Sequence, residues 1–151
     1  MIKNLFDLPI VNEIVDRINR LTADTKPLWG RMSVSQMLAH CNVTYEMVYD
    51  DIHPKPNAFM KFILKLLVKS KVVSEKPYAH NLRTAPSFLI KDEKEFEKEK
   101  ARLIAYIRKT QKLGPSHFDG KESHSFGKLP KHEWNNMFYK HLDHHLSQFG
   151  V

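Results

Sequence analysis

The chain has 151 residues, a formal net charge of +7 at pH 7 and one cysteine, Cys41, which excludes an intramolecular disulfide and a cysteine-rich zinc site. No apolar run approaches the roughly 18 residues of a membrane-spanning helix, and the N-terminus lacks the pattern of a secretory signal. We therefore expect a single domain over residues 1–151, located in the cytoplasm.

The positive net charge raises the question of nucleic acid or an anionic surface as a partner. Most lysines and arginines stand singly between apolar or acidic residues, and the densest charged run, residues 91–102, mixes both signs. A mixed run is typical of a solvated helix face. We therefore do not expect a nucleic-acid-binding protein.

Helical periodicity runs through most of the chain, and no stretch shows the alternation or hairpin turns of a sheet, so we predict an all-α fold. The first helix has an apolar stripe from Ile10 to Leu21 and ends before Pro27. The second begins at Ser33, whose hydroxyl forms a capping box with the Gln36 side chain. Its core positions are Val34, Met37, Leu38, Cys41, Tyr45 and Val48.

A third helix, basic and amphipathic, is predicted over residues 57–73. Such a helix can lie on an anionic membrane or bind a partner, but a bundle helix with Lys61, Lys65 and Lys69 outward has the same pattern. Because every bundle helix needs an apolar stripe, we favour packing in a bundle and do not expect membrane binding.

The region from Ser74 to Ser87 is polar, contains prolines and is long for a connection. Long loops often carry functional residues. We interpret this one as part of a substrate mouth, with Arg83 able to hold a carboxylate.

Two further helices complete the expected fold. The fourth runs from Asp92, an N-cap, to Gly114, a C-terminal glycine that precedes Pro115. After another loop, the last helix extends from near Pro130, which suits a first turn, to Phe149.

The last helix carries two histidines, His141 and His145, within its apolar stripe. At about 100° per residue, that face also contains Trp134, Phe138, Leu142 and Phe149. Residues one turn apart have Cβ atoms about 5 to 6 Å apart, so their ring nitrogens can converge on one metal ion. Two buried imidazoles would otherwise repel when protonated or need separate acceptors when neutral. The pair therefore predicts a divalent metal site.

A metal site of this kind needs a third ligand, and His40 on the second helix is the best candidate, because it lies on the flank of that helix's apolar stripe. The alternative for His40 is a hydrogen-bonded core histidine. The remaining histidines lie in loops, near a helix start or off the stripe, and are weaker candidates: His53, His80, His117, His124, His132 and His144.

Three other reactive residues are not expected to take part. Cys41 lies in the apolar stripe of the second helix, so we interpret it as a small core residue rather than a ligand or nucleophile. Asp143 and Tyr139 lie off the stripe of the last helix and are expected at the surface.

Two stretches of the sequence carry a resemblance to a known family. They are LWGRMSVSQMLAHCN, residues 28–42, and SFGKLPKHEWNNMFYKHLDHHLSQFG, residues 125–150, and together they cover a little over a quarter of the chain. The order of Trp-Gly, Met-Leu-Ala-His and Tyr-Lys-His-Leu-Asp-His-His resembles the signature regions of a DinB-like protein in the DinB and YfiT superfamily. One departure is Pro130, where a Ser or Thr cap would be usual.

The resemblance implies an up-and-down four-helix bundle with a long crossover between the second and third core helices. Either the basic segment or the charged fourth helix would be the third core helix. The resemblance also implies a divalent metal, such as zinc, nickel or iron, bound by one histidine of the second helix and the H-x-x-x-H pair of the last. Carried over to this sequence, these are His40, His141 and His145.

Two classes of function remain open. Relatives of the superfamily include thiol S-transferases, so one expectation is an enzyme whose metal activates a low-molecular-weight thiol or a water for thiol transfer or hydrolysis. No Asp or Glu is predicted on a core face as a general base. The alternative is a metal-free or metal-stabilised helical module that binds a small molecule or a partner protein. A homodimer fits the exposed helix faces, but no self-complementary patch is recognisable.

Overall fold

The computed structural model describes residues 1–80, 82 and 84–151. The fold is mostly α-helical in this part of the chain, as the sequence predicts. The helices are α1 (Leu8–Asn19), α2 (Val34–Tyr49), α3 (Ala58–Leu67), α4 (Lys69–Val73), α5 (Phe96–Phe118) and α6 (Lys131–Gln148). A short 3₁₀-helix, η1 (Pro86–Phe88), and two strands, β1 (Lys121–Ser123) and β2 (Gly127–Leu129), complete the elements.

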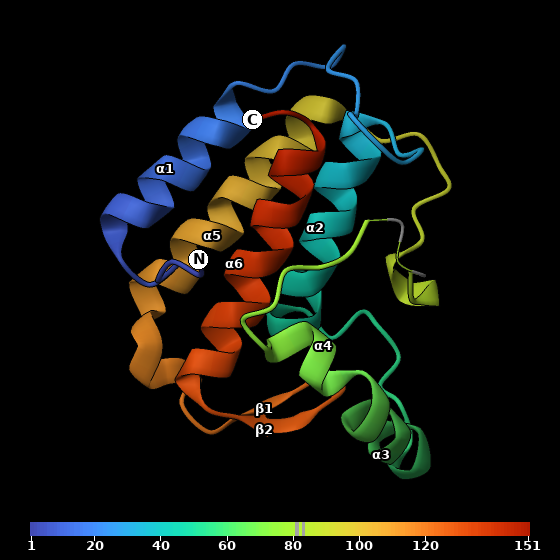
Figure 1. Cartoon of the computed structure of the whole chain (residues 1–151), viewed down its shortest axis with the longest axis vertical. Coiled ribbons are helices and arrows are strands. Elements are labelled where there is room, and N and C mark those ends of the chain that lie inside the picture. The colour runs from blue at the N-terminus through green and yellow to red at the C-terminus, as the bar shows by residue number, and fades with distance from the viewer. Residues whose placement is uncertain (81, 83) are drawn as a thin grey trace.

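Four helices pack against one another: α2 contacts α5 and α6, and α1 contacts the same two helices (Figure 1). The helices α2 and α5 run in the same direction. Asn42 donates to the Glu99 carboxylate at 2.8 Å, and further along both helices Asp50 accepts from the Tyr106 hydroxyl. The chain must therefore return along the length of the molecule between α2 and α5, and the long crossover of residues 50–95 does this.

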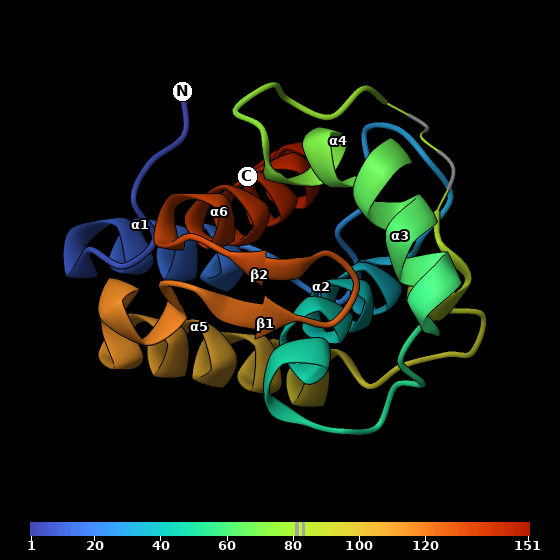
Figure 2. The same ribbon diagram turned by 90° about the horizontal axis from the view of Figure 1, so that it is seen from below.

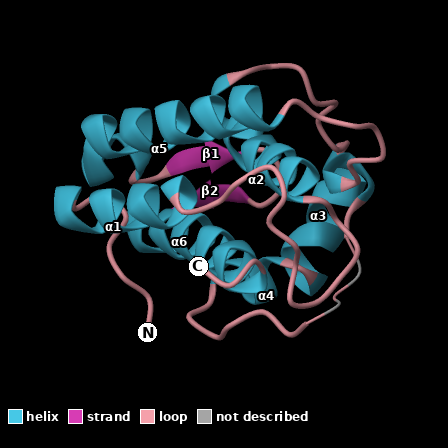
Figure 3. Cartoon of the chain, turned by 90° about the horizontal axis from the view of Figure 1, so that it is seen from above, coloured by secondary structure: helices cyan, strands magenta, loops and turns pink. Residues whose placement is uncertain are grey.

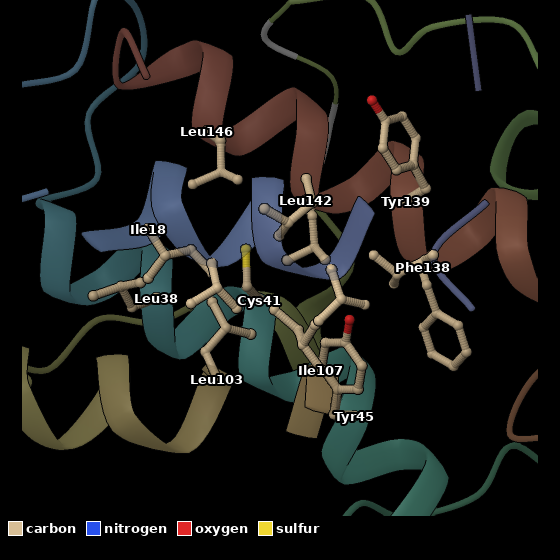
Figure 4. Close-up of a cluster of buried hydrophobic side chains, with 14 of the residues drawn as sticks. Ile18, Leu38, Cys41, Tyr45, Leu103, Ile107, Phe138, Tyr139, Leu142 and Leu146 are labelled. Carbon is tan, nitrogen blue, oxygen red and sulfur yellow. The ribbon is translucent and has the colours of Figure 1, made fainter. Parts of the chain in front are cut away.

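The core lies between these four helices (Figure 4). Ile18, Leu38, Leu103 and Leu142, one from each helix, are at most 1% exposed. Cys41 is buried among them, as predicted for a small core residue.

The expectation that Tyr139 lies at the surface is wrong, because its side chain is only 4% exposed. The helix α6 is covered by α1 as well as by α2, so its buried surface is wider than one apolar stripe. Asp143, also expected at the surface, is half-exposed and accepts from Arg17 of α1 at 2.7 Å.

The capping box at the start of α2 is confirmed. The Ser33 hydroxyl accepts from the Gln36 backbone N–H at 3.2 Å, and the Gln36 side chain accepts from the Ser33 N–H at 3.0 Å. The predicted N-cap at Asp92 is wrong, because α5 begins later, with Glu95 as its cap. At the other end Gly114 has a φ of 73° and breaks the regular helix, as its C-terminal position predicted.

The hairpin of β1 and β2 was not predicted. It is antiparallel, pairs Ser123 with Gly127, and lies across the end of the helix pack where α5 ends and α6 begins (Figures 2 and 3). Its strands have three residues each, too few for the alternation that identifies a strand in a sequence. The turn depends on Gly127, whose φ is 76°, and on Ser123, whose hydroxyl accepts from the Phe126 N–H at 2.9 Å.

The expectation that the basic third helix packs in the bundle is wrong for its first part, although its second part, α4, packs against α6. The segment forms α3 and α4 within the crossover, and α3 contains no buried residue. Figures 1 and 2 both place α3 at the edge of the molecule, outside the group of four helices. The third core helix is therefore the charged fourth helix of the sequence, α5. No described helix is both long and apolar enough to cross a membrane.

Candidate metal centre

The three predicted ligands, His40, His141 and His145, lie together in the structure. One ring nitrogen from each histidine lies within 4.8 Å of the other two. The Nε2 atoms of His40 and His141 are 3.0 Å apart, and the ring centroids of His40 and His145 are 4.5 Å apart. The group combines α2 with α6, which are 101 residues apart at the closest pair.

The packing of α2 on α6 brings the histidines together. His141 and His145 lie one turn apart on α6, so their rings project from the same side of that helix. The neighbouring pair Tyr45 and Phe138 stacks at 5.2 Å between centroids and fixes the register of the two helices. This register places His40, just over one turn before Tyr45, opposite the histidine pair.

The outer ring nitrogens of His40 and His141 are hydrogen-bonded. His40 donates from Nδ1 to the backbone carbonyl of Phe88, in η1, at 2.9 Å. His141 Nδ1 lies 3.0 Å from the hydroxyl of Thr44, which stands one turn after His40 on α2. Because a carbonyl only accepts, His40 carries its proton on Nδ1 and presents an unprotonated Nε2 to the group.

The outer nitrogen of His145 is held by a longer chain of contacts. His145 donates from Nδ1 to the Gln148 side-chain oxygen at 2.8 Å, and the Gln148 side-chain nitrogen donates to the Trp29 carbonyl at 2.8 Å. The second bond fixes which end of the Gln148 amide is oxygen, and so fixes the tautomer of His145. At Gly30 the backbone has a φ of 84°, and a Cβ would lie 2.5 Å from the Gln148 nitrogen. The Trp-Gly pair of the sequence therefore positions one of the candidate ligand histidines, His145, indirectly.

All three histidines are held neutral. Burial, followed by the neighbouring His145 and His40, keeps the pKa of His141 well below its ordinary value. Burial and then His40 lower the pKa of His145 to about 3, and burial lowers the pKa of His40. Neutral imidazole is the form that binds a metal.

The donor set fits a divalent transition metal. In a tetrahedral zinc site with Zn–N bonds of about 2.0–2.1 Å, the ligand nitrogens lie about 3.3 Å apart. The His40 and His141 Nε2 atoms are 3.0 Å apart, and a His145 ring nitrogen lies within 4.8 Å of both histidines. If His40 and His141 both carry protons on Nδ1, their Nε2 lone pairs face each other at 3.0 Å. A cation between them removes this repulsion. Imidazole nitrogens suit zinc, nickel and iron.

An outer layer of rings lies beside the three histidines. Trp29 stacks on His80 with centroids 4.0 Å apart, and His144 approaches the edges of Trp29 and Tyr78 at 6.0 and 5.6 Å. Tyr78 and His80 belong to the region 74–87 that the sequence suggested as a substrate mouth, so part of that region lies near the centre. The other residue suggested for the mouth, Arg83, is outside the described residues.

Two acidic side chains lie on a core face of the structure, although neither is placed to act as a general base at the histidines. Glu46 and Glu99 are 8% and 6% exposed and lie between α2 and α5. Both bind Arg102, Glu99 at 2.8 Å, and Glu46 also accepts from His53 at 2.7 Å. Neither belongs to the histidine group, so they bind cations of the scaffold rather than serve as bases there.

The supporting residues were not identified from the sequence, although some left a signal. Thr44 is four residues after His40, and Gln148 is three after His145, so each lies on the same helix face as a ligand. No local pattern indicates that Phe88 or Trp29 contributes a carbonyl, because Phe88 reaches His40, and Trp29 reaches Gln148, from distant parts of the chain.

Comparison with known proteins places the chain in a family without assigning a reaction. No curated protein and no solved structure is significantly similar to it. A family model described as a protein of unknown function, DUF1569, matches residues 3–150. The match includes both helices that carry the three histidines and the Trp-Gly pair that supports them, and the chain belongs to the DUF1569 family.

Proposed function

We propose that this protein is a divalent-metal-dependent enzyme of the DinB and YfiT type, in which His40, His141 and His145 hold zinc, nickel or iron. One observation carries the proposal: three neutral imidazoles converge while each outer nitrogen already has a hydrogen-bond partner. Such outer partners orient the rings and are typical of metal-binding histidines. The long crossover between parallel α2 and α5 supports the four-helix bundle of that superfamily as the scaffold.

The proposed chemistry is thiol S-transfer or hydrolysis of a small molecule. A metal held by three histidines would lower the pKa of a bound thiol or water and supply a nucleophile at neutral pH. The chain would hold that metal through rings fixed by Phe88, Thr44 and Gln148, and the stacked Trp29 and His80 would limit the access of water. Within the described residues no carboxylate joins the histidine group, so the activated thiol or water acts without a neighbouring general base.

Elemental analysis of the untagged protein, purified without chelator or nickel resin, tests the metal site. We expect about one metal ion per chain, and loss of the metal in the His141→Gln, His145→Gln double variant. The matched control is His117→Gln, His132→Gln, because both of these histidines are exposed and lie outside the group. Equal metal in both variants, or no metal in the parent after incubation with zinc, nickel or iron, would contradict the proposal.

Exchange of the metal for cobalt tests whether the site accepts a thiol, which thiol transfer requires. If the substrate is a thiol, adding glutathione to the cobalt protein produces the near-ultraviolet absorption of a cobalt thiolate. Cys41, the one cysteine of the sequence, is buried in the core, so the added thiol is the source of the signal. An unchanged spectrum at saturating thiol would leave hydrolysis as the proposed reaction.

A helical binding module is the second candidate. The 3.0 Å separation of the His40 and His141 Nε2 atoms also fits a direct hydrogen bond, with Thr44 donating to His141 Nδ1. In that arrangement the histidines serve the core without a metal. The module predicts that the His141→Gln, His145→Gln variant keeps small-molecule or partner binding, whereas the enzyme loses its activity.

A further inference from the structure

The helix α3 presents its apolar face to solvent rather than to the protein. Phe59, Phe62 and Leu66 are 73%, 62% and 66% exposed, and Met60 and Leu67 are also exposed. At about 100° per residue these side chains share one side of the helix. An exposed apolar face of this size on an otherwise packed protein indicates an interaction surface.

The side of α3 that carries Lys61 and Leu64 is turned toward the protein. Lys61 binds Glu122 of β1 at 2.5 Å, and Leu64, on the same side, packs against the core. These contacts fix the orientation of the helix, so its apolar face is held outward. Figures 1 and 2 show α3 at the edge of the molecule, where a large flat partner can reach it.

The charge of the segment that contains α3 is positive on balance. Residues 55–76 contain one acidic residue, Glu75, and six basic ones: Lys55, Lys61, Lys65, Lys69, Lys71 and Lys76. Carboxylates bind Lys55, Lys61 and Lys69. Lys65 and Lys71 are exposed, and the whole chain carries a net charge of +7. The apolar face therefore has a basic rim.

We propose that α3 docks this protein on the surface of an anionic lipid bilayer. An interfacial helix buries its apolar face roughly 5–10 Å deep and leaves basic side chains at the level of the headgroups. The exposed phenylalanines and leucines with their lysine rim match that arrangement. The helix lies in the interface and does not span the bilayer, because its ten residues are only about 15 Å long.

A second copy of the chain fits this face less well. A stable interface buries about 800 Å² on each partner, more than one side of a ten-residue helix provides. A symmetric dimer through α3 would also bring the same lysines of both copies together. Charge complementarity thus favours the anionic bilayer.

Vesicle flotation of the metal-loaded full chain tests the proposal. We expect about tenfold more protein on vesicles of phosphatidylcholine mixed with phosphatidylglycerol than on phosphatidylcholine alone, with binding that weakens as salt is added. The variant Phe59→Ser, Phe62→Ser, Leu66→Ser loses binding. Its control, Leu8→Ser, Leu113→Ser, removes exposed apolar side chains from α1 and α5 and keeps binding.

Charge is tested separately. Lys65→Glu, Lys71→Glu reduces binding about tenfold, whereas Arg108→Glu, Lys112→Glu, with the same change in net charge on α5, reduces it much less. Unchanged helicity and metal content in the α3 variants show that they are folded, as expected for side chains outside the core. No binding to the mixed vesicles by the parent overturns the proposal. So does a dimer in sedimentation velocity that the triple variant abolishes. Both results leave the metal proposal unaffected.

Discussion

Gly30 decides how firmly His145 is held. Its φ of 84° favours glycine, and a Cβ there would lie 2.5 Å from the Gln148 side-chain nitrogen. In Gly30→Ala the Gln148 side chain must move, so His145 loses its fixed acceptor. We expect metal affinity to fall about 10- to 100-fold, measured by competition with a chelator, and stability to fall by about 1–2 kcal/mol.

The control variant Gly120→Ala separates the two effects expected of Gly30→Ala, which are the loss of metal affinity and the loss of stability. Gly120 has a similar φ of 75°, but nothing lies within 4 Å of the position of its Cβ. The Gly120→Ala variant should lose about as much unfolding free energy as Gly30→Ala, and its metal affinity should be unchanged. If both variants bind the metal equally well, the contact between Gly30 and Gln148 does not support the site.

Among the elements, α4 is held to α6 by a buried lysine. Lys140 is 4% exposed and donates to the carbonyls of Lys71 and Ser74 at 2.8 and 2.6 Å, at the end of α4 where carbonyls lack helical partners. Burial lowers its pKa to about 8. Lys140→Met leaves these carbonyls unsatisfied, so we expect a loss of about 1–3 kcal/mol in unfolding free energy. Hydrogen exchange should rise in residues 69–80.

The comparison for this prediction is Lys131→Met, which removes an exposed lysine from the first turn of the same helix. An exposed lysine contributes little to stability, so this variant should exchange like the parent. Equal exchange in residues 69–80 of both variants would mean that Lys140 is not what holds α4.

For the whole molecule, the buried neutral histidines predict a loss of stability in acid for protein that holds no metal. The pKa of His145 is lowered to about 3 in the folded protein, against about 6.5 in an unfolded chain. The unfolded state therefore binds more protons below about pH 6.5, and stability falls as pH falls through that value. Between about pH 6.5 and 5, the protonation of His145 in the unfolded state alone lowers the unfolding free energy by about 2 kcal/mol.

Urea unfolding of chelator-treated protein at pH 7 and pH 5 measures this loss. His145→Gln removes one titrating group, so its stability should depend less steeply on pH than that of the parent. Identical pH dependence in the two proteins would show that His145 is not buried in its neutral form.

The histidine pair of α6 was predictable as a candidate metal site because its signal is local. A histidine pair at i and i+4 inside an apolar stripe can be recognised in the sequence. The capping box at Ser33 and the helix break at Gly114 can be recognised in the same way. The hairpin of β1 and β2 was not predicted because strands of three residues are too short to show the alternation of apolar and polar residues that identifies a strand.

The local sequence of this chain is sufficient for its all-α character, its main helices and the histidine pair of α6, because periodicity and caps act over one or two turns. The packing of the helices determined the rest. The carbonyl of Phe88 binds His40 and that of Trp29 binds Gln148, each across a long stretch of chain, and the packing of α1 on α6 buries Tyr139. Tertiary structure also determined that the apolar face of α3 points to solvent. An amphipathic stripe in a sequence specifies that a helix has an apolar face, but it does not specify what that face contacts.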